Sequence, residues 1–392
     1  MKKGWEYSKI GKLCKTYSGG TPLKNVKEYY QDGNIPWLRS GEVCKKYITE
    51  TEMFITQKGL ENSSAKYYPI NTVVVAMYGA TAAQVGILKI ETTSNQAVCG
   101  IIPNSRFLPE FLYYFFSYRK EFLASQAQGG AQPNISQIKI KNLEVPIPPL
   151  SEQQSIVDYL DSAFAKIDAM KANAEKALDE AKALFQASLK EMLEPQKEWE
   201  EKKFGKICDF VRGPFGGSLK KECFKDSGYA VYEQQNAIYN KFTFRYFIDE
   251  EKYNSLIRFK VNSGDLIMSC SGTIGKVAII PENFKEGIIN QALLKLTPNK
   301  DVDAHFLKYL MESNYFKEII NANIEGVAIK NIASVAVLKE IKLYVPKVSE
   351  QQKIVIEIDS LKSKVDRLQE NYEKISQECD ALKQAILRQV FE

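Results

Sequence analysis

The sequence lacks the residue patterns that metal proteins and many enzymes use. It contains a single histidine, His305, which excludes a polyhistidine metal site or a paired-histidine mechanism within the chain. Its seven cysteines form no CxxC, and their odd number favours reduced, mostly buried thiols over zinc or disulfide scaffolds. His305 stands beside Phe306 in a helix-like stretch, which favours a packing role for its ring.

The motifs of nucleotide-binding and hydrolytic enzymes are missing as well. No two of the 22 glycines are spaced as GxG, and the Gly-Lys pairs are followed by Leu, Ile or Val, so a P-loop is absent. GxSxG, HExxH and Asn-Pro-Pro-aromatic motifs do not occur. Acid-x-Lys fragments such as 250–252 arise by chance in a charged sequence. We therefore expect no catalytic residues, no metal and no cofactor in this chain.

Apolar runs of membrane length do not occur either. The most apolar stretch, 73–88, is interrupted by Gly79, Thr81, Gln84 and Gly86. The first ten residues lack the apolar segment of a secretory signal. These features predict no membrane contact and a cytoplasmic location.

What the sequence does contain is duplicated. The chain has 392 residues, whereas single domains seldom exceed about 250–300. Segments of the first half return in order: WEYSKIGKLC at 5–14 as WEEKKFGKIC at 199–208, Asn-Gln-Ala at 95–97 as 290–292, Asn-Ile at 134–135 as 331–332, and SEQQ at 151–154 as 349–352. A tandem duplication explains this order and predicts two similar domains related by a pseudo-twofold axis.

Charge follows the same division. The formal net charge is +7 over 1–150, −4 over 151–198, +4 over 199–348 and −2 over 349–392. Basic globular segments suit a polyanionic partner such as double-stranded DNA. We therefore predict two basic globular domains at 1–150 and 199–348, each followed by an acidic segment, at 151–198 and 349–392.

Each SEQQ segment is predicted to begin a long helix. Prolines precede it, its serine can cap the helix, and the glutamine three residues later can reach back to that cap. Apolar residues then recur in alternating steps of three and four, which is typical of a coiled coil of about four heptads or more. The residues predicted to pair the helices are Ile156, Leu160, Ile167, Met170, Leu184, Ile354, Ile358, Leu361, Val365, Leu368, Tyr372, Ile375, Leu382 and Ile386.

Such a stripe is also compatible with the core of a helical bundle. The matched phase and length of the two copies favour pairing with each other, and a pseudo-twofold arrangement makes that pairing antiparallel. A helix of about 43 residues spans about 65 Å, longer than one DNA turn of about 34 Å. We therefore expect the paired helices to act as a spacer.

The globular segments are predicted to mix α and β structure, so the expected fold class is α+β. The runs at 71–78, 84–90, 265–270 and 276–281 predict strands separated by glycine turns. The segments 109–126 and 303–321 each predict one helix.

Polar loops rich in Gly, Thr, Ser, Asn, Gln and Lys lie at equivalent positions in the two halves, 18–24 with 212–221 and 77–86 with 269–278. Glycine allows close approach of a ligand, hydroxyl and basic groups meet phosphates, and amides read base edges. Hairpin and turn chemistry is the alternative explanation for any one of them. The candidate DNA-binding residues are Thr21, Lys24, Arg39, Ser40, Tyr78, Thr81, Gln84, Gln96, Gln132, Asn134, Arg212, Ser218, Lys220, Gln234, Gln235, Asn236, Ser271, Thr273, Lys276, Gln291, Lys330 and Asn331.

Taken together, the proline-led SEQQ helices, the duplicated domains and the GTIGKVAII loop at 272–280 resemble the specificity (S) subunit of type I restriction-modification systems. The resemblance covers essentially the whole chain, with PIPPLSEQQSIVDYLD and VPKVSEQQKIVIEID similar to the family's helix entries. The first copy departs from it, because it reads GATAAQVGIL where the second reads GTIGKVAII.

The resemblance implies a non-catalytic subunit that reads DNA. In this family each recognition domain reads one half of an asymmetric, bipartite site, and the helices set the separation and dock two methyltransferase (M) subunits. Those subunits use S-adenosylmethionine to modify adenine, and restriction/translocase (R) subunits add translocation and cleavage with ATP and Mg²⁺. Two alternatives stay open: a free-standing DNA methyltransferase or nuclease, and a coiled-coil scaffold without DNA specificity.

Overall fold

The computed structural model describes residues 4–126, 134–215, 217–271, 273–322 and 335–392. The chain divides into two compact units, one formed by 1–175 with 372–392 and the other by 176–371. Each unit contains a globular domain and parts of the long helices α6 (Leu150–Leu193) and α13 (Val348–Phe391). The residues of unit 1 before α6 are called the first globular domain, and those between α6 and α13 the second globular domain.

The first globular domain is built on a mixed sheet. Its strands follow the order β2 (Thr16–Ser18), β9 (Val98–Ile101), β6 (Val73–Ala76), β7 (Val85–Leu88) and β4 (Tyr47–Ile48). A smaller sheet has the order β5 (Phe54–Ile55), β3 (Ile35–Leu38) and β8 (Thr93–Ser94), and β1 (Glu6–Lys9) pairs with β10 (Glu144–Ile147). The helices are α1 (Ile10–Leu13), α2 (Gln57–Glu61), α3 (Pro109–Tyr118), α4 (Lys120–Ser125) and α5 (Gln137–Lys141).

The second globular domain repeats this plan. Its larger sheet has the order β12 (Cys208–Arg212), β18 (Leu293–Pro298), β15 (Leu266–Ser269) and β16 (Val277–Ile279). Its smaller sheet has the order β14 (Phe247–Ile248), β13 (Tyr229–Tyr232) and β17 (Gly287–Ile289), and β11 (Glu200–Lys203) pairs with β19 (Lys342–Val345). The helices are α7 (Phe204–Ile207), α8 (Gln234–Tyr239), α9 (Glu250–Ser255), α10 (Ala304–Glu312), α11 (Asn314–Ala322) and α12 (Val335–Glu340).

The strands predicted at 71–78, 84–90, 265–270 and 276–281 are confirmed as β6, β7, β15 and β16. The prediction of one helix over 303–321 is wrong, because α10 ends before Ser313 and α11 begins after it. Ser313 has an extended backbone, and its hydroxyl accepts a hydrogen bond from the amide of Phe316 at 3.1 Å, as an N-cap does. The helix predicted over 109–126 is likewise divided, at Arg119 between α3 and α4.

His305 does not pack as predicted. It lies in the first turn of α10 with its side chain exposed, while Phe306, Tyr309 and Leu310 are buried. Because side chains on one face of a helix recur every three or four residues, the face that carries Phe306 and Tyr309 toward the core leaves His305 outside.

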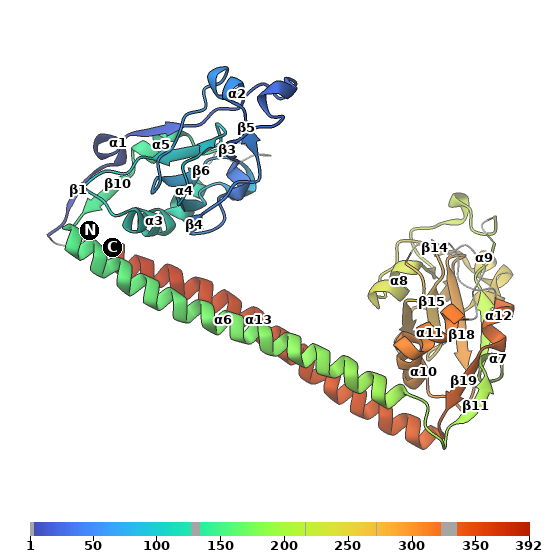
Figure 1. The fold of residues 1–392 in the computed structure, drawn as a ribbon. Coiled ribbons are helices and arrows are strands. Elements are labelled where there is room, and N and C mark those ends of the chain that lie inside the picture. The colour runs from blue at the N-terminus through green and yellow to red at the C-terminus, as the bar shows by residue number, and fades with distance from the viewer. Residues whose placement is uncertain (1–3, 127–133, 216, 272, 323–334) are drawn as a thin grey trace. The chain divides into compact units, whose positions relative to one another are not determined.

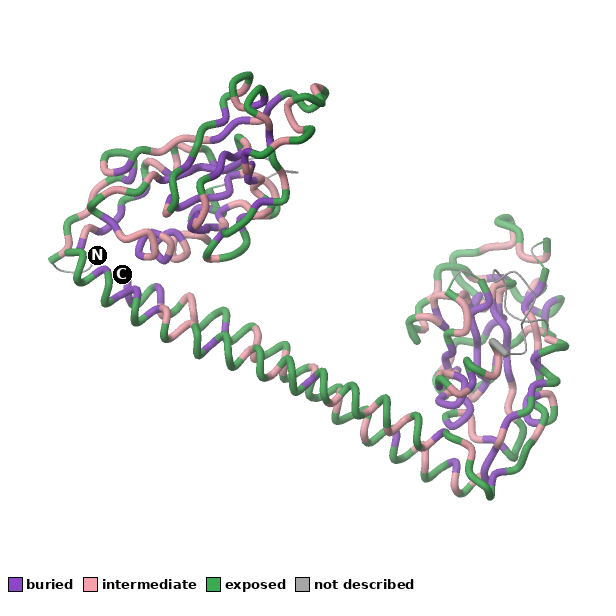
Figure 2. Tube along the Cα trace, viewed as in Figure 1, coloured by how far each residue is buried: buried purple, intermediate pink, exposed green. Residues whose placement is uncertain are grey.

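The long helices pair antiparallel within unit 1. The ammonium of Lys383 lies 5.3 Å from the centre of the Phe164 ring, and Lys171 forms an ion pair with Asp380 at 3.6 Å. Residue numbers thus rise along α6 as they fall along α13. Buried residues recur along both helices between exposed ones, as Figure 2 shows. The predicted α+β fold with long antiparallel paired helices is confirmed.

The seam between the helices differs by one residue from the predicted one at every second position. Met170 and Leu184 are 59% and 66% exposed, whereas Leu178 is buried and Lys171 and Phe185 are partly buried. A series shifted by one residue at alternate positions obeys the same steps of three and four, so the sequence pattern favoured the more apolar Met170 over Lys171. The prediction of Met170 and Leu184 as pairing residues is therefore corrected.

The same correction applies to α13. Leu368 and Leu382 are 40% and 47% exposed, and their neighbours Gln369 and Lys383 are partly buried. Gln369 accepts a hydrogen bond from Lys182 at 2.7 Å. The other predicted pairing residues are buried at Ile156, Leu160, Ile167 and Ile358, and partly buried at Ile354, Leu361, Val365, Tyr372, Ile375 and Ile386.

Candidate nucleic-acid interface

Several predicted DNA-binding residues of the first globular domain meet at one pocket. Thr21, Lys24, Arg39 and Gln96 line a cavity of about 650 Å³, with Trp37 among the residues of its wall. The hydroxyl of Thr21 donates to the side-chain oxygen of Gln96. Hydroxyl, amide and cationic groups of this kind can meet phosphates and base edges.

Two structural interactions shape that pocket. The indole nitrogen of Trp37 donates to the carbonyl of Gly20 at 2.9 Å, which ties the 18–24 loop to β3. Asn95 uses its side-chain oxygen to accept from the amide of Ala97 at 3.1 Å. That turn leaves the neighbouring Gln96 exposed on the rim of the pocket. The Asn-Gln repeat therefore combines one structural residue with one available to a ligand.

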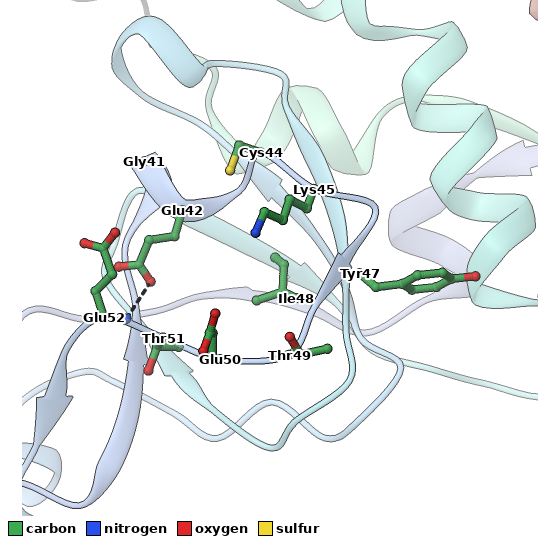
Figure 3. A pocket seen from close by; sticks show the side chains of 10 residues that line it. All are labelled: Gly41, Glu42, Cys44, Lys45, Tyr47, Ile48, Thr49, Glu50, Thr51 and Glu52. Atoms are coloured by element: carbon green, nitrogen blue, oxygen red, sulfur yellow. Dashed lines mark hydrogen bonds between the residues drawn. The ribbon is translucent and has the colours of Figure 1, made fainter. Parts of the chain in front are cut away.

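Arg39 stands directly after β3 and is held by carboxylates. Its Nε lies 3.1 Å from Glu42, and its Nη2 forms a second ion pair with Glu52. Figure 3 shows Glu42 reaching the backbone of Glu52, whose amide donates to the Glu42 carboxylate at 3.4 Å. The adjacent Ser40 begins a 3₁₀ turn and is partly exposed. The guanidinium is thus fixed in orientation while 41% of its side chain stays exposed.

The loop after β6 contains Tyr78, Thr81 and Gln84. Tyr78 forms an antiparallel bridge with Asn134, so the structure brings these two predicted residues together. Thr81 closes a turn, because its hydroxyl contacts the carbonyl of Tyr78 at 3.5 Å. Tyr78, Thr81 and Gln84 are partly exposed, and Asn134 is exposed.

In the second globular domain the equivalent loops form a smaller hollow. A cavity of about 110 Å³ is lined by Pro214, Leu219, Phe224, Val231, Glu233, Tyr246, Asn290 and Gln291. Gln291 is exposed beside an Asn290 that accepts from Ala292 at 3.0 Å, the same turn as in the first domain. Ser218 is partly exposed and Lys220 is exposed on the preceding loop.

Arg212 is partly buried at the end of β12. It lies beside the thiol of Cys270. Burial raises the pKa of that thiol to about 11. Its Nη1 is buried and has no hydrogen-bond partner within the described ranges. Arg212 is therefore partly buried near Cys270, and its role in DNA binding stays a prediction.

Asn236 has a structural role that differs from the predicted one. It is fully buried, and its side-chain oxygen accepts from the amide of Glu233 at 2.7 Å. Its side-chain nitrogen donates to the carbonyls of Lys241 and Thr243 at 2.7 and 3.1 Å. These bonds close a capping box at the start of α8, so the prediction of Asn236 as a base reader is corrected.

The two glutamines before Asn236 also make internal contacts. Gln234 donates to the carbonyl of Ser271, and Gln235 donates to Glu233 at 3.3 Å. The first contact brings Gln234 to the 269–278 loop, where Ser271, Thr273 and Lys276 are exposed. The segment that carries Gln234 therefore adjoins the 269–278 loop. Gln132, Lys330 and Asn331 lie outside the described residues.

The SEQQ segments join each domain to its helix, which the sequence did not reveal. In the first, Glu152 accepts a hydrogen bond from the indole nitrogen of Trp5 at 3.0 Å. In the second, Trp199 donates to Glu350 at the same distance. The repeated Trp and the repeated Glu, far apart in sequence, are thus two halves of one contact.

The first glutamine of each SEQQ segment is buried in that joint. Gln153 accepts from the amide of Leu108 at 2.9 Å and donates to the carbonyls of Arg106 and Pro148 at 2.8 and 2.9 Å. Gln351 does the same with Asp303, Asp301 and Pro346 at 2.7, 2.9 and 2.8 Å.

The capping box predicted for SEQQ is wrong. The helices begin at Leu150 and Val348, before the serines, and Gln154 bonds to Asp158 instead of reaching back. The pairing of the distant Trp and Glu residues could be inferred only from the fact that both segments repeat together.

A tyrosine and an aspartate reinforce each joint. Tyr114 of α3 donates to Asp161 of α6, which also pairs with Lys46. Tyr309 of α10 donates to Asp359 of α13. Burial and the adjacent carboxylate raise the pKa of both phenols above its ordinary value, so both stay protonated donors at neutral pH.

Among the described residues, no cluster of three or more His, Cys, Asp or Glu side chains is arranged to hold a metal ion. Over the same ranges, no helix combines the length and apolarity needed to cross a bilayer.

Known proteins share the sequence pattern and the fold. Residues 2–179 and 196–377 each match the family described as type I restriction modification DNA specificity domain. The specificity subunit of the Escherichia coli type I restriction enzyme EcoR124I/EcoR124II is 29% identical over 161 residues. The matched residues make up 40% of this chain and 40% of that subunit. The MjaVIII specificity subunit of Methanocaldococcus jannaschii is 24% identical over 411 residues, 98% of this chain and 91% of the relative.

A solved structure extends the likeness to the fold. A chain from work on complex assembly and conformational transition of the type I R-M system has a TM-score of 0.77 and 19% identity, covering 100% of this chain and 98% of its own. At that identity the likeness concerns the fold alone.

Proposed function

This chain belongs to the type I restriction modification DNA specificity family, and on that premise we propose that it is the subunit that recognises DNA in a type I restriction-modification complex. Each globular domain reads one half of a bipartite, asymmetric site in double-stranded DNA. The antiparallel helices set the separation of the halves and dock two M subunits. The chain itself carries out no chemistry.

The observation that carries this proposal is the combination of like joints with unlike loops. Trp5, Glu152 and Gln153 repeat as Trp199, Glu350 and Gln351 with matching hydrogen bonds. The loops at the pockets differ in residues and in volume, about 650 against about 110 Å³. Two domains mounted alike but lined differently suit the reading of two different sequences.

The partners supply the reactions in this proposal. The M subunits bind S-adenosylmethionine and methylate adenine at the site that this chain selects. R subunits join them for ATP- and Mg²⁺-dependent translocation and cleavage. The net positive charge of +7 over 1–150 and +4 over 199–348 favours the DNA contact on which all of this depends.

Methylation mapping tests the proposal. The chain is expressed with its M subunit, and every methylated adenine in DNA of known sequence is located. We expect one gapped motif with two unlike halves. Methylation or cleavage by the purified chain alone identifies an enzyme instead, and equal affinity for all duplexes at matched salt identifies a scaffold.

The role of the helices has a separate test. One heptad is inserted into both, after Ala174 in α6 and after Ser376 in α13, so that the seam keeps its phase. Seven residues add about 10.5 Å, or about three base pairs. We expect the gap of the motif to lengthen by about that amount with both half-sites unchanged. An unchanged gap shows that the helices do not set it.

A further inference from the structure

An ion pair occupies the same place in both globular domains with its charges exchanged. Arg39 directly follows β3, and its partner Glu52 stands two residues before β5. In the second domain Glu233 directly follows β13, and its partner Arg245 stands two residues before β14.

Strand register establishes that these positions are equivalent. β3 and β5 pair antiparallel with Ile35 opposite Ile55, and β13 and β14 pair antiparallel with Tyr229 opposite Ile248. β3 also pairs parallel with β8, as β13 does with β17. The central strand of each small sheet thus ends at one member of the pair, and its antiparallel neighbour follows the other.

The carboxylate of Glu233 grips Arg245 along one edge. Nε and Nη2 lie 3.0 and 2.9 Å from its two oxygens. The arginine side chain is 62% exposed, whereas that of Glu233 is 12% exposed. Of the five N–H groups of a guanidinium, this geometry uses two and leaves the other three, on Nη1 and Nη2, outside the contact with Glu233. Tyr246 adds a cation–π contact, because its ring centre lies 5.5 Å from the guanidinium carbon.

Arg39 is held in a comparable way. Its Nε contacts Glu42 and its Nη2 contacts Glu52, while its side chain is 41% exposed at the pocket that Thr21 and Gln96 also line. Exposed ion pairs contribute little to folding stability, so stabilisation alone does not explain these arrangements. An exposed guanidinium held in a fixed orientation is suited to binding a flat ligand edge that offers two hydrogen-bond acceptors.

We propose that Arg39 and Arg245 are the guanine-reading residues of the first and second domains, each positioned by its carboxylate partners. The assignment rests on the proposed function as a DNA-recognition subunit. Guanine offers two acceptors, O6 and N7, in the major groove, and a guanidinium edge meets both at once. Glu233 is the positioning residue, because both its oxygens are bound by Arg245 and its side chain is nearly buried.

The exchange of charges gives the two domains different readings. In the first domain the arginine projects from the end of the central strand, and in the second from the approach to the neighbouring strand. The guanidinium therefore stands at one position of the ion pair in the first domain and at the other position in the second domain. We expect the guanine, or its paired cytosine, to stand at non-equivalent places in the two half-sites.

Methylation mapping of the full chain with its M subunit tests this assignment. Arg245→Ala and Arg245→Lys should each reduce the preference for one guanine of the second half-site by about 5- to 150-fold, the discrimination typical of a bidentate contact. Lysine keeps the charge but lacks the planar fork. Arg39→Ala should act likewise on the first half-site alone, so the untouched half is the internal control in every variant.

Glu233→Gln tests positioning. It should relax the same base as Arg245→Ala by a smaller factor, which a merely structural role would not do. Lys203→Ala, which removes an exposed ion pair with Glu340 in the β11 and β19 ribbon, should leave the motif unchanged.

Two results overturn the assignment while sparing the proposed function. One is an unchanged motif with methylation reduced evenly at all sites and a salt dependence lowered by about one ion, which identifies a phosphate contact. The other is an unchanged motif at unchanged extent. If the wild-type chain yields no bipartite motif at all, the proposed function fails and the assignment fails with it.

Discussion

The two globular domains agree where they meet their helices and differ where their loops form pockets. At the joints, Trp5 and Trp199 donate to glutamates at 3.0 Å, and the buried side chains of Gln153 and Gln351 each make three hydrogen bonds. At the pockets, the ion pair after the central strand has its charges exchanged. The joint between domain and helix is therefore one arrangement that occurs twice, whereas the loops at the pockets differ between the two domains.

The interiors of the larger sheets differ as well. In the second domain Lys295 of β18 forms a buried ion pair with Asp265 at 3.3 Å. In the first domain the equivalent strand β9 has Gly100, and the ring of Tyr68 fills the space above it. Each interior therefore solves the same packing problem with different chemistry, and substitutions can separate the shared features from the individual ones.

The largest effect is expected from Lys295→Met. It leaves the carboxylate of Asp265, whose side chain is 1% exposed, without its cation, and breaking a buried pair costs about 3–5 kcal/mol. Hydrogen exchange of β15 and β18 amides measures the loss, with β6 and β9 as the internal reference. A loss below about 1 kcal/mol, or one shared equally by both domains, contradicts a buried pair specific to the second domain.

Gln153→Leu and Gln351→Leu test the shared joint. Each leaves one amide and two carbonyls of the joint without their partner, so each should lower the free energy of unfolding of its own domain by about 2–4 kcal/mol. The matched control is Gln154→Leu, one residue further along on the exposed face of α6. Clearly unequal effects of the two buried substitutions contradict an equivalent joint.

Gly100→Ala sharpens the difference between the interiors. A Cβ at this position lies 2.4 Å from a ring carbon of Tyr68, which is fully buried and cannot swing away. Overpacking of this kind costs about 1–3 kcal/mol, measured as a fall in the free energy of unfolding of the first domain. The double variant Gly100→Ala with Tyr68→Leu should recover part of the loss, and failure to do so indicates that the strain lies elsewhere.

The smallest effect is expected from Trp5→Phe and Trp199→Phe. Each removes one hydrogen bond to a glutamate but keeps most of the aromatic packing, at a cost of about 1 kcal/mol. Thermal unfolding of the two variants compares them directly. A shift for one tryptophan and none for the other shows that the repeated contact is not equivalent in the two domains.

The sequence predicted what depends on periodicity and repetition. The duplicated segments, the strands β6, β7, β15 and β16 and the antiparallel helices all follow from spacing along the chain. Spacing alone did not place the seam, because Lys171 and Gln369 lie in it while the more apolar Met170 and Leu368 do not. Local hydrophobicity misleads where a polar side chain finds a partner across the helix pair.

The candidate site was predictable by region and less so by residue. Arg39, Thr21 and Gln96 were all candidates from the sequence, and they line one pocket. Asn236 belongs to the same kind of segment, but its side chain is hydrogen-bonded in a capping box. The sequence analysis missed Arg245, because only strand register shows that it occupies the position equivalent to Glu52 in the other domain. Which polar side chains are left free depends on tertiary hydrogen bonds that composition does not contain.

One measurement tests the central claim that a common mounting carries two separate readers. Residues 199–345 are replaced by residues 5–147 of the same chain, so that the first domain occupies both places, and the product is mapped by methylation with the M subunit. Because the joints are equivalent, we expect a symmetric motif made of two inverted copies of the first half-site. Retention of the original asymmetric motif would contradict it, since sequence preference would then lie outside the exchanged domain.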